Sequence, residues 1–184
     1  MKSRRRKGFG RRAGFSLLEI MITVMIAGII STLAVLGFRK AINHQKLLGE
    51  TGKLLSKMRY IASEARVSKR NIAVYSNFVD NYMIAWHDED MDGVLDDTET
   101  VIDSMRMGSG IDFIAGKRGI TLKSGQMLFY FFSNGAPTSD TQLALYSTET
   151  QEFKGILIRQ SSGWVEEYEL SPGEKQSLSN YIDK

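Results

Sequence analysis

The segment from Asp88 to Glu99 combines the residue types and the spacing of a calcium-binding loop. In a twelve-residue loop of this kind, acidic side chains at positions 1, 3, 5, 9 and 12 and a backbone carbonyl at position 7 bind the ion, while a glycine at position 6 permits the turn. Each of these positions is filled here, with Gly93 at position 6. The candidate ligands are Asp88, Asp90, Asp92, Val94, Asp96 and Glu99.

Two interpretations of this acidic loop, residues 88–99, stay open. An EF-hand has a helix on each side of its loop, whereas both flanks here have the composition of strands, so a Ca²⁺ site would lie in a different structural frame. The alternative is a solvated Asp/Gly turn that binds no metal. Residues 71–105 contain nine acids and no Lys or Arg. Repulsion among these charges disfavours the empty loop, and Ca²⁺ is the one cofactor that the sequence suggests.

A further carboxylate, Glu19, lies at the start of a long apolar run. The nineteen residues from Ile20 to Phe38 carry no charge, and a helix of that length covers about 30 Å at about 1.5 Å per residue, which is the thickness of a bilayer core. An unpaired carboxylate in that environment costs several kcal/mol. Residues 15–38 are therefore predicted to form a transmembrane helix in which Glu19 requires a partner.

The charges of the chain are segregated along the sequence. Residues 1–14 hold seven bases and no acid, and only Arg39 and Lys40 directly follow the apolar run. By the positive-inside rule, the N-terminus is expected in the cytoplasm and the rest of this single-pass chain on the other side of the membrane, periplasmic or extracytoplasmic. The net charge is +3, so the chain without its first seven bases carries −4. The basic character therefore does not indicate nucleic-acid binding.

The junction Gly14-Phe15-Ser-Leu-Leu-Glu19 resembles the leader of type IV pilins and pseudopilins, a basic peptide that ends in Gly and is followed by an F-[ST]-L-x-E pattern. The resemblance implies cleavage after Gly14 by the prepilin peptidase, N-methylation of Phe15 and assembly of the apolar helix into a filament. It also implies that Glu19 neutralises the terminal amine of a neighbouring subunit, and buried ion pairs of this kind are best known for fixing register. A plain signal anchor or a cleaved secretory signal is the alternative.

Beyond the apolar run, the pattern predicts an amphipathic helical stem over residues 39–70 and a β-rich head over residues 71–184. The apolar stripe of the stem comprises Leu47, Leu48, Leu54, Leu55, Met58, Ile61, Ala62 and Ala65. The predicted strands are 72–75, 82–86, 100–105, 120–122, 127–132, 143–146, 155–159 and 164–168. Ser171-Pro172-Gly173-Glu174 has the pattern of a capped helix start, so a short C-terminal helix is expected through Tyr181.

The fold class predicted from these elements is α+β, a long N-terminal helix packed on an antiparallel β-sandwich head. The succession of Tyr82–Trp86, an Asp-Gly loop, Phe131–Gly135 and Ile156–Arg159 resembles the GspH/FimT-type family of minor pseudopilins and minor pilins. This resemblance implies a role in starting or capping a filament, with other pilins and an assembly platform as partners. Where DNA-uptake relatives carry a Gly-Arg pattern, this chain has Gly163-Trp164-Val-Glu-Glu, whose acidic charge repels phosphate.

No enzymatic activity is expected from the sequence. The chain has no cysteine and only two histidines, His44 and His87, which leaves no thiolate zinc site and no cysteine nucleophile. It also has no G-x-S-x-G or H-E-x-x-H motif. The predicted function is therefore that of a minor pseudopilin or minor pilin, and the alternatives are a DNA-uptake minor pilin and a membrane-anchored calcium-binding protein that never polymerises.

Overall fold

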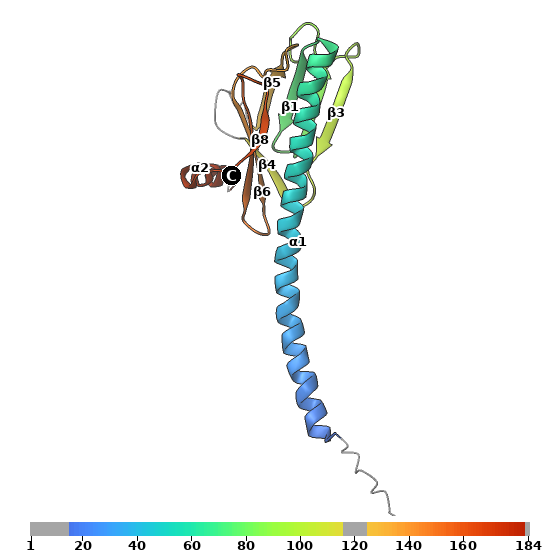
Figure 1. The fold of residues 1–184 in the computed structure, drawn as a ribbon, viewed down its shortest axis with the longest axis vertical. Coiled ribbons are helices and arrows are strands. Elements are labelled where there is room, and N and C mark those ends of the chain that lie inside the picture. Colours follow the sequence, from blue (N-terminus) through green and yellow to red (C-terminus); the bar gives the residue numbers. More distant parts are fainter. Residues whose placement is uncertain (1–14, 116–124, 183–184) are drawn as a thin grey trace, which may run out of the picture. The chain divides into compact units, whose positions relative to one another are not determined.

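The computed structural model describes residues 15–115 and 125–182. Within these residues a long helix, α1 (Leu17–Ser68), precedes eight strands, and a short helix, α2 (Pro172–Ile182), follows them (Figure 1). The strands are β1 (Ile72–Asn77), β2 (Tyr82–His87), β3 (Val101–Arg106), β4 (Ile111–Ala115), β5 (Gln126–Phe131), β6 (Thr141–Ser147), β7 (Phe153–Ile158) and β8 (Val165–Tyr168). The chain divides into two compact units, residues 1–39 and 40–184, and α1 contributes to both.

The N-terminal unit consists, where it is described, of the first half of α1. Ser16 caps the helix, because its hydroxyl accepts a hydrogen bond from the backbone N–H of Leu18 at 3.2 Å. The hydroxyls of Thr23, Ser31 and Thr32 each donate to the carbonyl four residues earlier, so these polar groups are satisfied within the helix itself. By length and composition, α1 qualifies as a membrane-spanning helix.

The second unit contains two antiparallel sheets of four strands each. Sheet A has the strand order β3-β2-β1-β5, and sheet B has the order β4-β6-β7-β8. The central pairing of sheet A places Ala73 opposite both Trp86 of β2 and Tyr130 of β5. The ladder between β2 and β3 shifts register between Ala85 and Trp86, and this irregularity lies directly before the acidic loop. Such bulges increase the twist of a strand and redirect the chain that follows.

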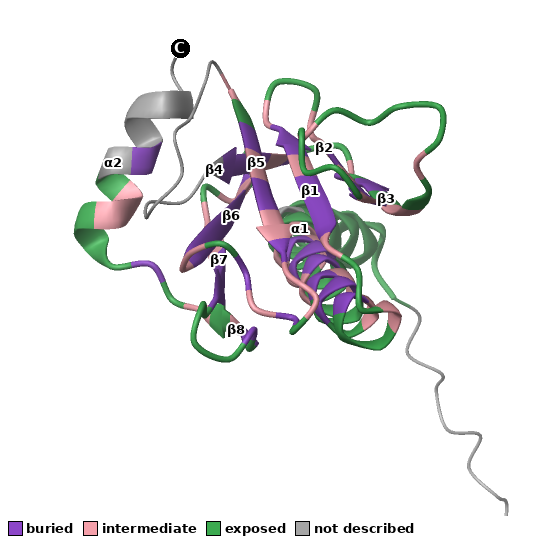
Figure 2. Ribbon diagram, turned by 90° about the horizontal axis from the view of Figure 1, so that it is seen from above, coloured by how far each residue is buried: buried purple, intermediate pink, exposed green. Residues whose placement is uncertain are grey.

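One apolar core joins the helical stem to both sheets. Six of the eight predicted stripe residues of the stem are at most 1% exposed, and Leu55 packs against the same core from a partly buried position. Sheet A contributes Val74 and Phe129 among others, while sheet B contributes Phe113 and Ile156. Figure 2 shows the buried face of the stem turned toward the strands. The predicted α+β fold, with a long helix on antiparallel sheets, is confirmed.

Seven of the eight predicted strands correspond to observed strands, with ends that differ by a few residues. The remaining prediction, 120–122, lies outside the described residues. Strand β4 was not predicted, although Ile111 and Phe113 alternate with the polar Asp112 as in a strand that is buried on one face. A single apolar alternation of this length is a weak sequence signal for a strand. The strand is stabilised by its antiparallel pairing with β6, which the local sequence does not show.

Helix α2 begins as the sequence predicts. Ser171 is the N-cap and Pro172 the first helical residue, and the Glu174 carboxylate accepts hydrogen bonds from the Ser171 backbone N–H at 2.8 Å and from its hydroxyl at 2.7 Å. This arrangement is a capping box. Leu178 of the helix joins Ile114, Ala144 and Leu170 in a second, smaller apolar cluster against sheet B.

Candidate functional site

The predicted assembly segment lies at the start of α1. Glu19 occupies the first helical turn, and the surrounding apolar side chains are exposed in the single chain, with Phe15 and Leu17 each 77% exposed. No ion pair within the described residues involves Glu19. The predicted leader and its last residue, Gly14, lie outside the described residues. An exposed apolar helix of this size requires a lipid or protein environment.

The acidic loop connects β2 to β3 and is closed at its base by a backbone hydrogen bond from His87 N–H to the Thr100 carbonyl, at 3.0 Å. Its residues are largely exposed (Figure 2). Gly93 has φ +75°, a conformation that L-residues rarely adopt. A Cβ at this position would lie 2.5 Å from Leu128 of β5. The turn therefore requires glycine for its conformation and for its close approach to the sheet.

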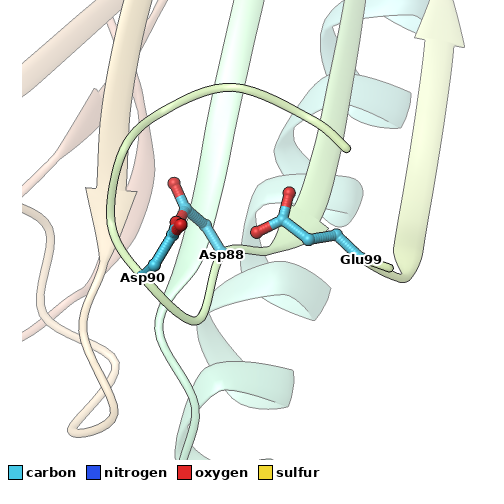
Figure 3. Close-up of side chains that lie close together, drawn as sticks. All are labelled: Asp88, Asp90 and Glu99. Carbon is cyan, nitrogen blue, oxygen red and sulfur yellow. The ribbon is translucent and has the colours of Figure 1, made fainter. Parts of the chain in front are cut away.

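Three of the six predicted ligands converge at the base of the loop. One carboxylate oxygen from each of Asp88, Asp90 and Glu99 lies within 4.8 Å of the other two, and the three side chains point toward one another (Figure 3). Asp92 and Asp96 lie outside this group of three. The Asp92 carboxylate accepts a hydrogen bond from the Val94 N–H, and the Asp96 carboxylate accepts from the N–H and hydroxyl of Thr98. We name Asp88, Asp90 and Glu99 the carboxylate cluster.

Asp88 is the fully buried member of the carboxylate cluster, with 0% exposure. Its Oδ2 accepts two hydrogen bonds of 2.9 Å, one from the Gly93 N–H and one from the Tyr130 hydroxyl. Its Oδ1 is buried and has no hydrogen-bond partner. A buried carboxylate oxygen without a partner carries a desolvation cost that a bound cation would remove.

The pKa shifts of Glu99, Asp96 and Tyr130 reflect burial, the negative charge and the hydrogen bonds of the acidic loop. Burial, together with the charges of Asp88 and Asp96, raises the pKa of Glu99, whereas the hydrogen bonds from Thr98 lower the pKa of Asp96. Burial and the hydrogen bond to Asp88 raise the pKa of Tyr130 far above its ordinary value, so this hydroxyl remains a donor. The ion pairs among the described residues include Arg70 with Glu89 but none with the carboxylate cluster. The cluster thus concentrates negative charge without a basic partner there.

Sequence reasoning did not single out Tyr130. The alternation of β5 contains the signal, because Phe129 and Phe131 point into the core and Tyr130 must then lie on the opposite face. What the sequence alone does not show is that this face adjoins the acidic loop.

The segment that lacks the Gly-Arg pattern of DNA-uptake relatives forms local ion pairs. Arg159 contacts Glu166 at 2.7 Å and Lys154 contacts Glu167 at 2.9 Å, while the guanidinium of Arg59 lies 5.8 Å from the ring centre of the exposed Trp164. Each base is matched by an acid or an aromatic ring. This surface offers no concentrated positive charge to a phosphate backbone.

Comparisons with known proteins agree with these features. Residues 10–35 match the family model of the prokaryotic N-terminal methylation motif. The fold is similar to the minor pseudopilin EpsH from the type 2 secretion system of Vibrio cholerae, with 14% identity and a TM-score of 0.50 over 70% of this chain and 99% of that chain. The type IV minor pilin FimU of Pseudomonas aeruginosa PAO1 gives 15% identity and a TM-score of 0.50 over 68% and 90%. The sequence matches no curated protein.

The chain therefore combines an N-terminal methylation motif with a pilin-like fold, a long helix followed by antiparallel sheets. Its head has a fold similar to that of a minor pseudopilin and a minor pilin, so the fold implied by the predicted resemblance is confirmed. The predicted residues of cleavage and assembly, Gly14, Phe15 and Glu19, lie within the matched motif.

Proposed function

We propose that this protein is a minor pseudopilin or minor pilin that enters a filament through its N-terminal helix and helps to initiate or cap it. The observation that carries the proposal is the methylation motif over residues 10–35, which includes the exposed apolar start of α1. The role is structural rather than enzymatic. Its partners are other pilins, the prepilin peptidase and the assembly platform, and its location is the bacterial inner membrane, with the head in the periplasm.

Processing provides the first test of this proposal. Cleavage after Gly14 would leave Phe15 as an N-methylated terminus at the cytoplasmic end of the helix. Mass spectrometry of the protein extracted from membranes should find a chain that begins at methylated Phe15. An intact Met1 terminus in cells that contain the peptidase, or cleavage after Ala34, would contradict the proposal.

Assembly provides the second test, because only a filament supplies a partner for Glu19. Glu19→Val keeps the helix apolar but removes the carboxylate that would pair with the terminal amine of a neighbouring subunit. The variant should be processed and inserted normally, yet fail to crosslink to sister subunits. Thr23→Val, one turn further along α1, is the matched control and should crosslink like the parent. Undiminished crosslinking of Glu19→Val would favour an anchored protein that does not polymerise.

The type of filament system follows from the phenotype of a deletion. Loss of an exported protein with normal pili identifies a secretion pseudopilus, and loss of pili identifies a type IV pilus. A deletion that loses only DNA uptake would support the DNA-uptake alternative.

We propose as a second function that the carboxylate cluster binds one divalent cation, and that this cation is Ca²⁺. The specific observation in its favour is the fully buried Asp88, whose Oδ1 lacks a partner while the cluster gathers three carboxylates. Ca²⁺ accepts irregular sets of oxygen ligands, whereas Mg²⁺ demands near-octahedral geometry and releases water reluctantly. Equilibrium dialysis of the purified protein against CaCl₂ should therefore find one bound ion, and equal MgCl₂ should displace little of it. Absence of bound Ca²⁺ would refute the site.

A further inference from the structure

Sheet A has an inner face in the main core and an outer face that points away from it. Ile72 and Val74 of β1 belong to the core, so Ala73 between them points outward. Ala73 pairs with Trp86 on one side and with Tyr130 on the other, which places these three residues in one row across the outer face. Trp86 is only 2% exposed and Ala73 is fully buried, although neither belongs to the two core clusters. The outer face of sheet A is therefore covered near this row.

The acidic loop makes direct contact with this outer face. Gly93 lies so close that an added Cβ would be 2.5 Å from a Leu128 methyl carbon and 3.2 Å from the Tyr130 hydroxyl oxygen. Leu128 and Tyr130 alternate with the core residues Met127 and Phe129 on β5. The middle of the loop thus lies against the outer side of β5, which is separated from β2 by β1.

One oxygen of Asp88 joins the middle of the loop to strand β5 by hydrogen bonds. Oδ2 of Asp88 accepts both the Gly93 N–H from the middle of the loop and the Tyr130 hydroxyl from β5. The other oxygen of Asp88 has no hydrogen-bond partner, and its carboxylate belongs to the carboxylate cluster with Asp90 and Glu99. A ligand that holds the Asp88 carboxylate in this orientation therefore also holds the loop against the sheet. In the absence of a cation, three acidic groups within 4.8 Å of one another repel and favour opening of the loop.

We propose that a Ca²⁺ ion held by Asp88, Asp90 and Glu99 acts as a latch that closes the acidic loop over the outer face of sheet A, with Tyr130 as the positioning residue on the sheet. This inference rests on the cation site proposed above and adds its structural consequence. Removal of the ion opens the loop and exposes the row that contains Trp86. Tyr130 does not bind the ion; its hydroxyl orients the Asp88 carboxylate from the sheet side.

Trp86 offers an internal reporter of this closure. The chain has two tryptophans, and the other, Trp164, is 60% exposed. In full-length protein in detergent micelles, Trp164→Phe leaves Trp86 as the only tryptophan. Acrylamide quenching of its fluorescence, and hydrogen exchange of backbone amides in residues 89–98, are measured with CaCl₂, with MgCl₂ and with chelator. Equilibrium dialysis measures Ca²⁺ binding independently of both readouts.

Three variants in this background separate binding from closure. Asp90→Asn removes a ligand and should lose both binding and the Ca²⁺-dependent protection of Trp86 and the loop amides. Tyr130→Phe removes only the hydroxyl on the sheet, so it should still bind Ca²⁺ but lose most of the protection. Asp97→Asn makes the same charge change at an exposed acid outside the cluster and should respond like the parent.

The outcomes distinguish the proposed closure of the loop from the proposed binding of Ca²⁺. If Ca²⁺ binds but neither Trp86 quenching nor loop exchange changes, the latch is wrong and the cation site stands. If Tyr130→Phe is protected as fully as the parent, its role as positioning residue is wrong. If no Ca²⁺ binds to the parent, both the site and the latch are overturned.

Discussion

At the scale of single residues, Asp88 is the group whose surroundings most require an explanation, because it is a fully buried carboxylate with one oxygen unpartnered. A ligand that binds only the folded state raises the free energy of unfolding by RT ln(1 + [L]/Kd), about 2.7 kcal/mol when free ligand is about 100 times Kd. The protein should therefore melt at a higher temperature in millimolar Ca²⁺ than in chelator, and Mg²⁺ should raise the melting temperature much less.

The control for this prediction keeps the shape of the loop and removes its charge. Asp88→Asn combined with Glu99→Gln should abolish the difference between Ca²⁺ and chelator in a thermal melt followed by circular dichroism, while the head stays folded. Equal melting temperatures of the parent protein under both conditions would mean that residues 88–99 are an acidic turn only.

The ion pair between His44 and Glu152 is expected to make the stability of the head depend on pH. His44 of the stem and Glu152, in the turn between β6 and β7, lie 2.6 Å apart. The hydrogen bond from His44, aided by its charge, by Thr150 and by Lys40, lowers the pKa of Glu152 below its ordinary value near 4.5. Because the folded-state pKa is depressed, the stabilisation is complete above the unfolded-state pKa and is lost as the pH falls through the folded-state pKa.

The expected effect of this pair is small, because the two side chains are 43% and 39% exposed and solvent screens them. Urea unfolding should show the parent more stable than Glu152→Gln at about pH 6, with the difference shrinking toward about pH 3. A difference that is the same at both pH values would show that the ion pair contributes nothing to stability. His44→Gln should reproduce the pH response of Glu152→Gln.

At the scale of elements, the stem half of α1 contributes its apolar stripe to the core between the sheets. Leu54 is fully buried there, whereas Val67, on the same helix, is 76% exposed. Leu54→Ala should lower the free energy of unfolding by about 2–5 kcal/mol, since it leaves a cavity in a packed core. Val67→Ala should change it by less than about 0.5 kcal/mol. Equal effects of the two substitutions on the urea midpoint would contradict the placement of the stripe.

At the scale of the whole molecule, the two units differ in what stabilises them. Among the residues that the structure describes, every member of both core clusters lies within residues 40–184, so this unit has an apolar core of its own. Removal of residues 1–39 should leave the melting temperature of the head within about 2 °C, which corresponds to less than about 1 kcal/mol for a domain of this size. It should also abolish the need for detergent. Unfolding or aggregation of the truncated protein would show that the head depends on the N-terminal helix.

The features that the sequence predicted are those with a local or periodic cause. The apolar length after Glu19, the stripe from Leu47 to Ala65 and the capping box at Ser171 each depend on residues within one helix or one turn, so their spacing already contains the physical interaction. The resemblance to the pilin leader is likewise contained in a few consecutive residues, and it is confirmed by the methylation motif.

Other features were decided only by the tertiary structure. The acidic loop predicted six calcium ligands, yet the fold brings three of them together, Asp88, Asp90 and Glu99. The carboxylates of Asp92 and Asp96 accept hydrogen bonds from Val94 and Thr98 within the loop. Tyr130 reaches Asp88 across 42 residues of sequence, since β5 pairs with β1 rather than with its neighbours in the chain. Strand β4 likewise depends on its partner β6. Sheet pairing joins residues that are distant in sequence, and no local spacing encodes which strands will meet.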